Sequence, residues 1–115
     1  MRILDVDEAS PREAAALTPH LADGEEVLAA FASPTGAILF TERRLIVVQP
    51  EHLLEEKVET TSWPWREVKR FAIQEGEART AVRIWLGGDD HPLHLRADSG
   101  GGLIALQRLL AERVG

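Results

Sequence analysis

The centre of the sequence reads Ala37-Ile38-Leu39-Phe40-Thr41-Glu42-Arg43-Arg44-Leu45-Ile46-Val47-Val48-Gln49. Two short apolar arms flank three polar residues, Thr41 to Arg43, and both arms contain β-branched side chains that suit a pleated, buried surface. Polar residues between two apolar runs are typical of a β-hairpin turn. The stretch therefore predicts two buried strands joined by a tight turn, and it carries no catalytic motif.

The composition predicts one soluble globular domain. The chain has 115 residues, of which 44% are hydrophobic and 28% charged, so it is long enough to close a core. It has no cysteine, which excludes disulfides and thiolate metal ligands and fits a cytoplasmic protein. We expect no secretory signal and no membrane span, because no run approaches the roughly 18 apolar residues that a span requires.

The charge is acidic and unevenly distributed. The net charge is −6, and residues 1–31 hold seven acids against two bases. An acidic chain lacks the long-range field that attracts phosphate backbones or anionic lipids. We therefore expect no nucleic-acid partner and no membrane binding.

The first part of the chain carries helix signals. Ser10-Pro11-Arg12-Glu13 has a capping serine, a proline at the first helical position and a glutamate three residues after the serine. Thr18-Pro19 then stops this helix, and Asp23-Gly24 ends the helical region. We expect residues 1–22 to form a short helical lead packed on a main domain of residues 23–115.

Seven short strands are expected in that domain, each marked by alternation or by an apolar run between turn residues. They cover residues 25–33, 37–40, 44–49, 57–65, 68–75, 79–86 and 91–97. A helix from Leu103 to Arg113 follows, with an apolar stripe of Leu103, Leu106, Leu110 and Val114. The order predicts a mainly β fold: an antiparallel sheet rolled into a partly open barrel or an orthogonal sandwich, with the helix plugging an open end.

Five segments resemble one known family. They are Asp23-Gly24-Glu25-Glu26-Val27, the hairpin core Leu39 to Ile46, Lys57-Val58-Glu59 through Pro64-Trp65, Val82-Arg83-Ile84-Trp85-Leu86, and Leu106-Gln107-Arg108-Leu109-Leu110-Ala111. On these residues the sequence resembles the bacterial pleckstrin-homology (PH) domain family of small stand-alone proteins.

The resemblance implies a PH-like barrel of seven antiparallel strands in two orthogonal sheets, capped by a C-terminal helix. It also implies no known catalysis, no cofactor, and ring-shaped homo-oligomers, pentamers among them. The first hairpin loop, Ser33-Pro34-Thr35-Gly36, contains no lysine or arginine. Phosphoinositide binders of the wider PH class carry basic residues there, so we expect no phosphoinositide binding.

One group of residues has the side-chain types of metal ligands: Asp89, Asp90, His91 and His94. If residues 91–97 form a strand, His91 and His94 point to opposite faces, because side chains alternate along a strand. A metal site requires convergent ligands. We therefore favour a solvated turn and keep a metal-dependent hydrolase as a remote alternative.

Two further motifs favour structural explanations. Ser99-Gly100-Gly101-Gly102 precedes a helix, where free N–H groups can bind anions, but it lacks the lysine and spacing of a phosphate loop. We interpret it as a flexible joint. A basic group of Arg43, Arg44, Arg66, Lys69 and Arg70 is interspersed with six acids in residues 42–70, which favours a mixed, salt-bridged surface.

The tryptophans are the candidate interaction residues. All three lie in expected strands: Trp63, Trp65 and Trp85. Trp85 shares a strand face with Arg83, opposite Val82 and Ile84, and an exposed tryptophan beside an arginine is typical of an interface hot spot. The alternative is that the N-terminal lead covers Trp85.

We therefore expect a non-enzymatic PH-like scaffold, without catalytic residues, cofactor or metal. It would associate with itself, and with other proteins, through sheet edges or through a surface containing Trp85, Arg83, Trp63 and Trp65. The alternative of another class is a ligand- or lipid-binding PH-like module.

Overall fold

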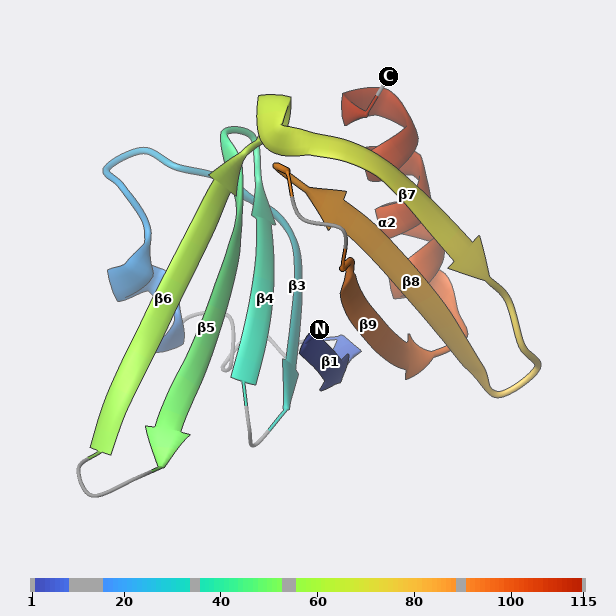
Figure 1. The fold of residues 1–115 in the computed structure, drawn as a ribbon, viewed down its shortest axis with the longest axis horizontal. Helices are drawn as coiled ribbons and strands as arrows, with labels where there is room; N and C mark the ends of the chain where they lie inside the picture. The colour runs from blue at the N-terminus through green and yellow to red at the C-terminus, as the bar shows by residue number, and fades with distance from the viewer. Residues whose placement is uncertain (1, 9–15, 34–35, 53–55, 89–90, 115) are drawn as a thin grey trace.

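The computed structural model describes residues 2–8, 16–33, 36–52, 56–88 and 91–114 (Figure 1). Its strands are β1 (Arg2–Asp5), β2 (Asp7–Glu8), β3 (Val27–Ser33), β4 (Gly36–Thr41), β5 (Arg44–His52), β6 (Glu56–Pro64), β7 (Val68–Gln74), β8 (Arg79–Leu86) and β9 (Leu93–Asp98). The C-terminal helix is α2 (Gly101–Arg113), and two 3-10 turns are η1 (Thr18–His20) and η2 (Trp65–Glu67).

The strands form two sheets. A four-stranded sheet has the order β1-β9-β8-β7, and a five-stranded sheet has the order β2-β3-β4-β5-β6. The strands of the two sheets run across one another, and α2 packs beside the four-stranded sheet (Figure 1). The seven expected antiparallel strands, β3 to β9, and the C-terminal helix are confirmed.

The expected barrel is not closed in the part of the chain that the structure describes, because β6 and β7 are not paired. Pro64 ends β6, and a proline has no N–H to continue a ladder. The 3-10 turn η2 then redirects the chain into the other sheet. The architecture is therefore two separate sheets around one core.

The start of the chain differs from the expected helical lead. Residues 2–5 form β1, which pairs in parallel with β9, and residues 7–8 form β2, which pairs with β3. The proposed capping box, residues 10–13, lies outside the described residues, and the residues described before β3 show no complete α-helix. A 3-10 turn at Thr18–His20 follows.

The main core lies between the two sheets and α2. Phe31, Phe40 and Ile84 are among its fully buried side chains. The helix stripe was predicted correctly, since Leu106 and Leu110 are 0% exposed and Leu103 is buried beside them. Apolar burial of this kind contributes about 1.5–3 kcal/mol for each large side chain.

A second apolar cluster lies on the other face of the five-stranded sheet. It contains Ala37, Leu39, Ile46 and Val48, and the partly buried Leu17 and Leu21 pack on it. This explains why every residue of β4 is buried. Leu17 and Leu21 therefore cover part of the outer face of the five-stranded sheet.

An ion pair between Arg44 and the buried Glu25 carboxylate connects the central hairpin to the entry of β3. The Glu25 side chain is 0% exposed and accepts two hydrogen bonds from Arg44, from Nε to Oε2 and from Nη2 to Oε1, each 2.9 Å long. The Thr41 hydroxyl donates to Oε2 at 2.7 Å, and the Ala22 backbone N–H donates to Oε1 at 2.9 Å. Each carboxylate oxygen thus has two donors, which compensates for the loss of water.

The same ion pair shifts the pKa values of both partners. The hydrogen bonds from Arg44 lower the pKa of Glu25 from 4.5 to about 2, with further help from the Ala22 N–H and the Thr41 hydroxyl and against the opposing effect of burial. The hydrogen bonds with Glu25 raise the pKa of Arg44. Both groups are therefore held in their charged forms.

This ion pair predicts an acid-dependent loss of stability. As the pH falls, the unfolded chain protonates Glu25 near its ordinary pKa of 4.5, whereas the folded chain does so only near 2. The stabilisation is therefore complete above about pH 5 and is lost as the pH approaches 2, a change of about 3 kcal/mol. Urea unfolding of the wild type and of Glu25→Gln across this range should give two curves that converge as the pH falls. A constant separation would contradict this assignment.

Candidate functional site

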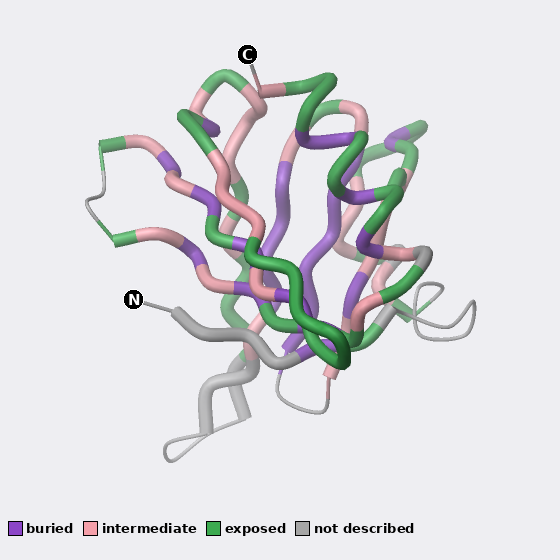
Figure 2. Tube along the Cα trace, turned by 90° about the vertical axis from the view of Figure 1, so that its right-hand side faces the viewer, coloured by how far each residue is buried: buried purple, intermediate pink, exposed green. Residues whose placement is uncertain are grey.

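The outer face of the four-stranded sheet carries the candidate site. Along β8, Val82, Ile84 and Leu86 are buried, whereas Arg83 is exposed and Trp85 is half-buried, as side-chain alternation requires. Figure 2 shows the alternation of buried and exposed positions along the strands. The prediction that Trp85 points away from the core is confirmed.

Trp85 is contacted by two arginines. The Arg70 guanidinium carbon lies 4.1 Å from the centre of the indole ring, and that of Arg83 lies 5.4 Å from it. Arg70 is the cross-strand neighbour of Trp85 on β7, and Arg83 precedes it by two residues on β8. Each contact is a cation–π interaction, worth about 0.5–1 kcal/mol at an exposed site.

The basic character continues onto β9. His94 is the cross-strand neighbour of Arg83, and Arg96 is that of Ala81. The Nε2 atom of His94 is buried and has no hydrogen-bond partner among the described residues. We call Arg70, Arg83, Trp85, His94 and Arg96 together the arginine–tryptophan face.

The outward carboxylate on β9 is Asp98. It pairs with Arg79 at 2.8 Å, and Arg79 also donates to the Arg96 carbonyl at 3.2 Å. Across the described parts of the chain, no carboxylate forms an ion pair with Arg70 or Arg83. These two guanidinium groups therefore have N–H donors available for an external acceptor.

Trp63 and Trp65 do not belong to this face. Both are partly buried against the main core. The Trp65 ring stacks on Phe40 with 6.3 Å between ring centres, and its Nε1 donates to the Thr41 carbonyl at 2.8 Å. The structure therefore brings Trp85 and Arg83 together and places Trp63 and Trp65 against the core.

The basic residues near the hairpin are largely paired with acids. Arg43 contacts Glu42 at 3.1 Å, and Arg44 is held by Glu25. Arg70 lies apart from them, on Trp85. Sequence reasoning placed Arg70 in that mixed group and missed His94 and Arg96; the cross-strand register was the information that it lacked.

The family is decided by a comparison of the whole chain with known families. Residues 3–114 match the family model described as the bacterial PH domain. The chain belongs to the bacterial PH domain family. A relative, the uncharacterized protein YjqA of Bacillus subtilis (strain 168), is 32% identical over 91 residues, with 73% of each chain covered.

Solved structures show the same fold. A DUF1696-family protein with a pleckstrin-homology domain from Shewanella loihica PV-4 has a TM-score of 0.74 at 22% identity, covering 94% of this chain and 96% of that one. A pleckstrin homology domain from Shewanella amazonensis SB2B has a TM-score of 0.66 at 24% identity, covering 90% and 96%. At these identities the similarity shows the PH-like fold alone.

The remaining motifs of this bacterial PH domain are only partly described by the structure. Among the described residues, no group of three or more histidine or acidic side chains could hold a metal ion. His91 precedes β9, and Asp89 and Asp90 lie outside the described residues. None of the helices that the structure describes is long and apolar enough to cross a membrane.

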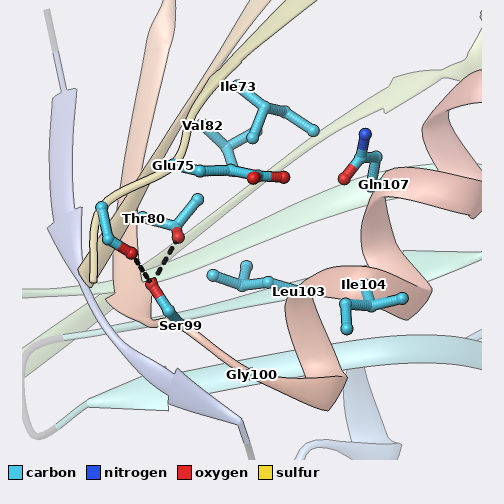
Figure 3. Close-up of a pocket in the computed structure, with 10 residues that line it drawn as sticks. Ile73, Glu75, Thr80, Val82, Ser99, Gly100, Leu103, Ile104 and Gln107 are labelled. Atoms are coloured by element: carbon cyan, nitrogen blue, oxygen red, sulfur yellow. Dashed lines mark hydrogen bonds between the residues drawn. The ribbon is translucent and has the colours of Figure 1, made fainter. Parts of the chain in front are cut away.

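The glycine-rich joint before α2 lies beside a hollow of about 230 Å³ (Figure 3). The Ser99 hydroxyl donates to the Gly76 carbonyl at 2.8 Å and lies 2.6 Å from the Thr80 hydroxyl, so it fixes the β7–β8 hairpin to the helix. The Glu75 carboxylate lines the same hollow and would repel an anion. The joint therefore has the features of a structural connection.

Proposed function

We propose that this bacterial PH domain is a non-enzymatic, cytoplasmic scaffold that associates with itself into a homo-oligomer through the arginine–tryptophan face. One observation carries the proposal: Trp85 lies on an outer sheet face between two arginines without an ion-pair partner among the described residues. Tryptophan and arginine are the residues most enriched at interface hot spots. A cyclic oligomer such as a pentamer is the form that the resemblance noted in the sequence implies.

The position of the N-terminal segment supports this use of the face. Leu17 and Leu21 pack on the five-stranded sheet, so these two described residues of the segment do not cover Trp85. A half-buried tryptophan contributes most to the free energy of association when a partner removes the rest of its surface from water. Contact with another subunit would do so.

The molar mass in solution tests the proposal. Size-exclusion chromatography with light scattering at micromolar concentration should give a multiple of the 12.7 kDa chain mass. A single species at the mass of one chain would refute self-association.

Trp85→Ala should dissociate this oligomer and leave the fold intact. The truncation removes a hot-spot side chain, for which losses of at least 2 kcal/mol per contact are typical. Within one chain it removes two cation–π contacts and the packing of a half-buried ring on the outer face of the sheet, not a core side chain. Light scattering should therefore show monomers with an unchanged circular dichroism spectrum.

Val58→Ala is the matched control for Trp85→Ala. Val58 is 61% exposed on β6, which is an edge strand of the five-stranded sheet. The control variant should remain oligomeric. If Val58→Ala dissociated the oligomer and Trp85→Ala did not, the interface would lie at the edge of the five-stranded sheet and not at the arginine–tryptophan face.

A further inference from the structure

The charge of the arginine–tryptophan face restricts how two copies can meet. Arg70 is exposed on β7 and Arg83 on β8, and neither has a carboxylate partner among the described residues. If two copies met face to face about a two-fold axis, this face of one copy would oppose the same face of the other. Their arginines would then be brought together, and like charges across an interface cost several kcal/mol.

Among the described residues, the chain also carries exposed acids without ion-pair partners on other elements. Asp23 and Glu26 are exposed in the segment between η1 and β3, and no cation among the described residues pairs with either side chain. The neighbouring acids differ, because Glu25 is held by Arg44 and Glu42 by Arg43. Asp23 and Glu26 are therefore the available carboxylates of this segment.

The two charged regions belong to different sheets. Asp23 and Glu26 come shortly after Leu17 and Leu21 in the chain. Those two leucines pack on the outer face of the five-stranded sheet. The arginine–tryptophan face is the outer face of the four-stranded sheet. Asp23 and Glu26 lie in the loop that enters β3, where the Glu42 N–H donates to the Glu26 carbonyl, so they are not part of the arginine–tryptophan face.

From this arrangement we infer that the arginine–tryptophan face of one copy docks on Asp23 and Glu26 of the next copy, with guanidinium–carboxylate pairs around Trp85. The inference deepens the proposed self-association and rests on it. The contact joins two different surfaces, so it is heterologous and generates a closed ring or an open chain of subunits, not a two-fold dimer.

Charge exchange tests this contact. The variants are Arg70→Glu/Arg83→Glu and Asp23→Lys/Glu26→Lys, each studied alone and in an equimolar mixture by sedimentation velocity. The matched control is Arg66→Glu/Arg108→Glu, which makes the same charge change at two exposed arginines outside the face. Circular dichroism checks that each variant is folded.

Each charge-reversed variant alone should be monomeric, the mixture of the two should regain association, and the control should behave as the wild type.

A second measurement uses the wild type alone. Its association should weaken between about 50 mM and about 500 mM NaCl, because salt screens exposed charges. A two-fold wild-type dimer, oligomeric charge variants, or a mixture that stays monomeric would overturn the heterologous contact and leave self-association standing. A monomeric wild type would refute the proposed function and this contact with it.

Discussion

Arg44→Ala is expected to lower the free energy of unfolding by about 3–5 kcal/mol, because it leaves the buried Glu25 carboxylate without its cationic partner. The substitution deletes both guanidinium donors to Glu25, whose side chain is 0% exposed. It also removes the 3.1 Å hydrogen bond from Arg44 to the His20 carbonyl. Domains of this kind are stable by about 5–15 kcal/mol, so the loss is a large fraction of the total. Urea unfolding at neutral pH measures it.

The neighbouring residue provides the control. Arg43→Ala breaks the ion pair with Glu42, in which the two side chains are 54% and 29% exposed. Exposed pairs contribute about 0–1 kcal/mol, so this variant should unfold near the wild-type midpoint. If Arg43→Ala and Arg44→Ala lowered the free energy of unfolding equally, the burial of Glu25 would not explain the loss of stability in Arg44→Ala.

Phe40→Ala is the second large expected loss, about 3–5 kcal/mol. Phe40 is 0% exposed, and its ring meets Phe31 edge-on at 6.4 Å and stacks on Trp65 at 6.3 Å. Truncation leaves a cavity between the two sheets that rigid strands cannot close. Chemical unfolding should show the loss as a lower midpoint with an unchanged slope.

Phe40→Leu is the comparison for this variant. Leucine retains most of the apolar volume, and volume-conserving changes usually cost less than about 1.5 kcal/mol. If leucine and alanine at position 40 destabilised the protein equally, cavity formation would not explain the loss.

Local patterns predicted the elements whose side chains alternate between water and core. The strand β8 and the stripe of α2 were predicted correctly because each has one buried face. The hairpin of β4 and β5 was predicted correctly from its two continuous apolar runs, which are buried on both faces of the five-stranded sheet. Pattern reasoning failed where the register shifts. A β-bulge between Val27 and Ala29 places Val27 in the outer cluster and Phe31 in the main core, although the alternation assigns both to one face.

Long-range pairings were the other source of error. The strand β1 forms by parallel pairing with β9, about ninety residues later in the chain. The sequence of its four residues does not indicate that pairing. Alternation along the expected strand placed Trp63 and Trp65 on one face, as candidate interaction residues. In the structure Trp65 lies in η2 and stacks on Phe40, so its ring packs on the core.

For the candidate site, the sequence predicted Trp85 and Arg83 because they alternate with core residues on a single strand. Arg70 was not assigned to it. A second bulge, between Val68 and Arg70, changes the alternation of β7, and only the cross-strand register brings Arg70 onto Trp85. The charge imbalance of the face likewise depends on which arginines have partners, which is a property of the folded chain.

Hydroxyl-radical footprinting of the wild-type protein tests the central claim most directly. Oxidation at each tryptophan is quantified by mass spectrometry at protein concentrations below and above those at which the molar mass rises. The account predicts that oxidation of Trp85 falls strongly on assembly, whereas that of Trp63 and Trp65, which already pack on the core, changes little. Unchanged oxidation of Trp85 across assembly would contradict it.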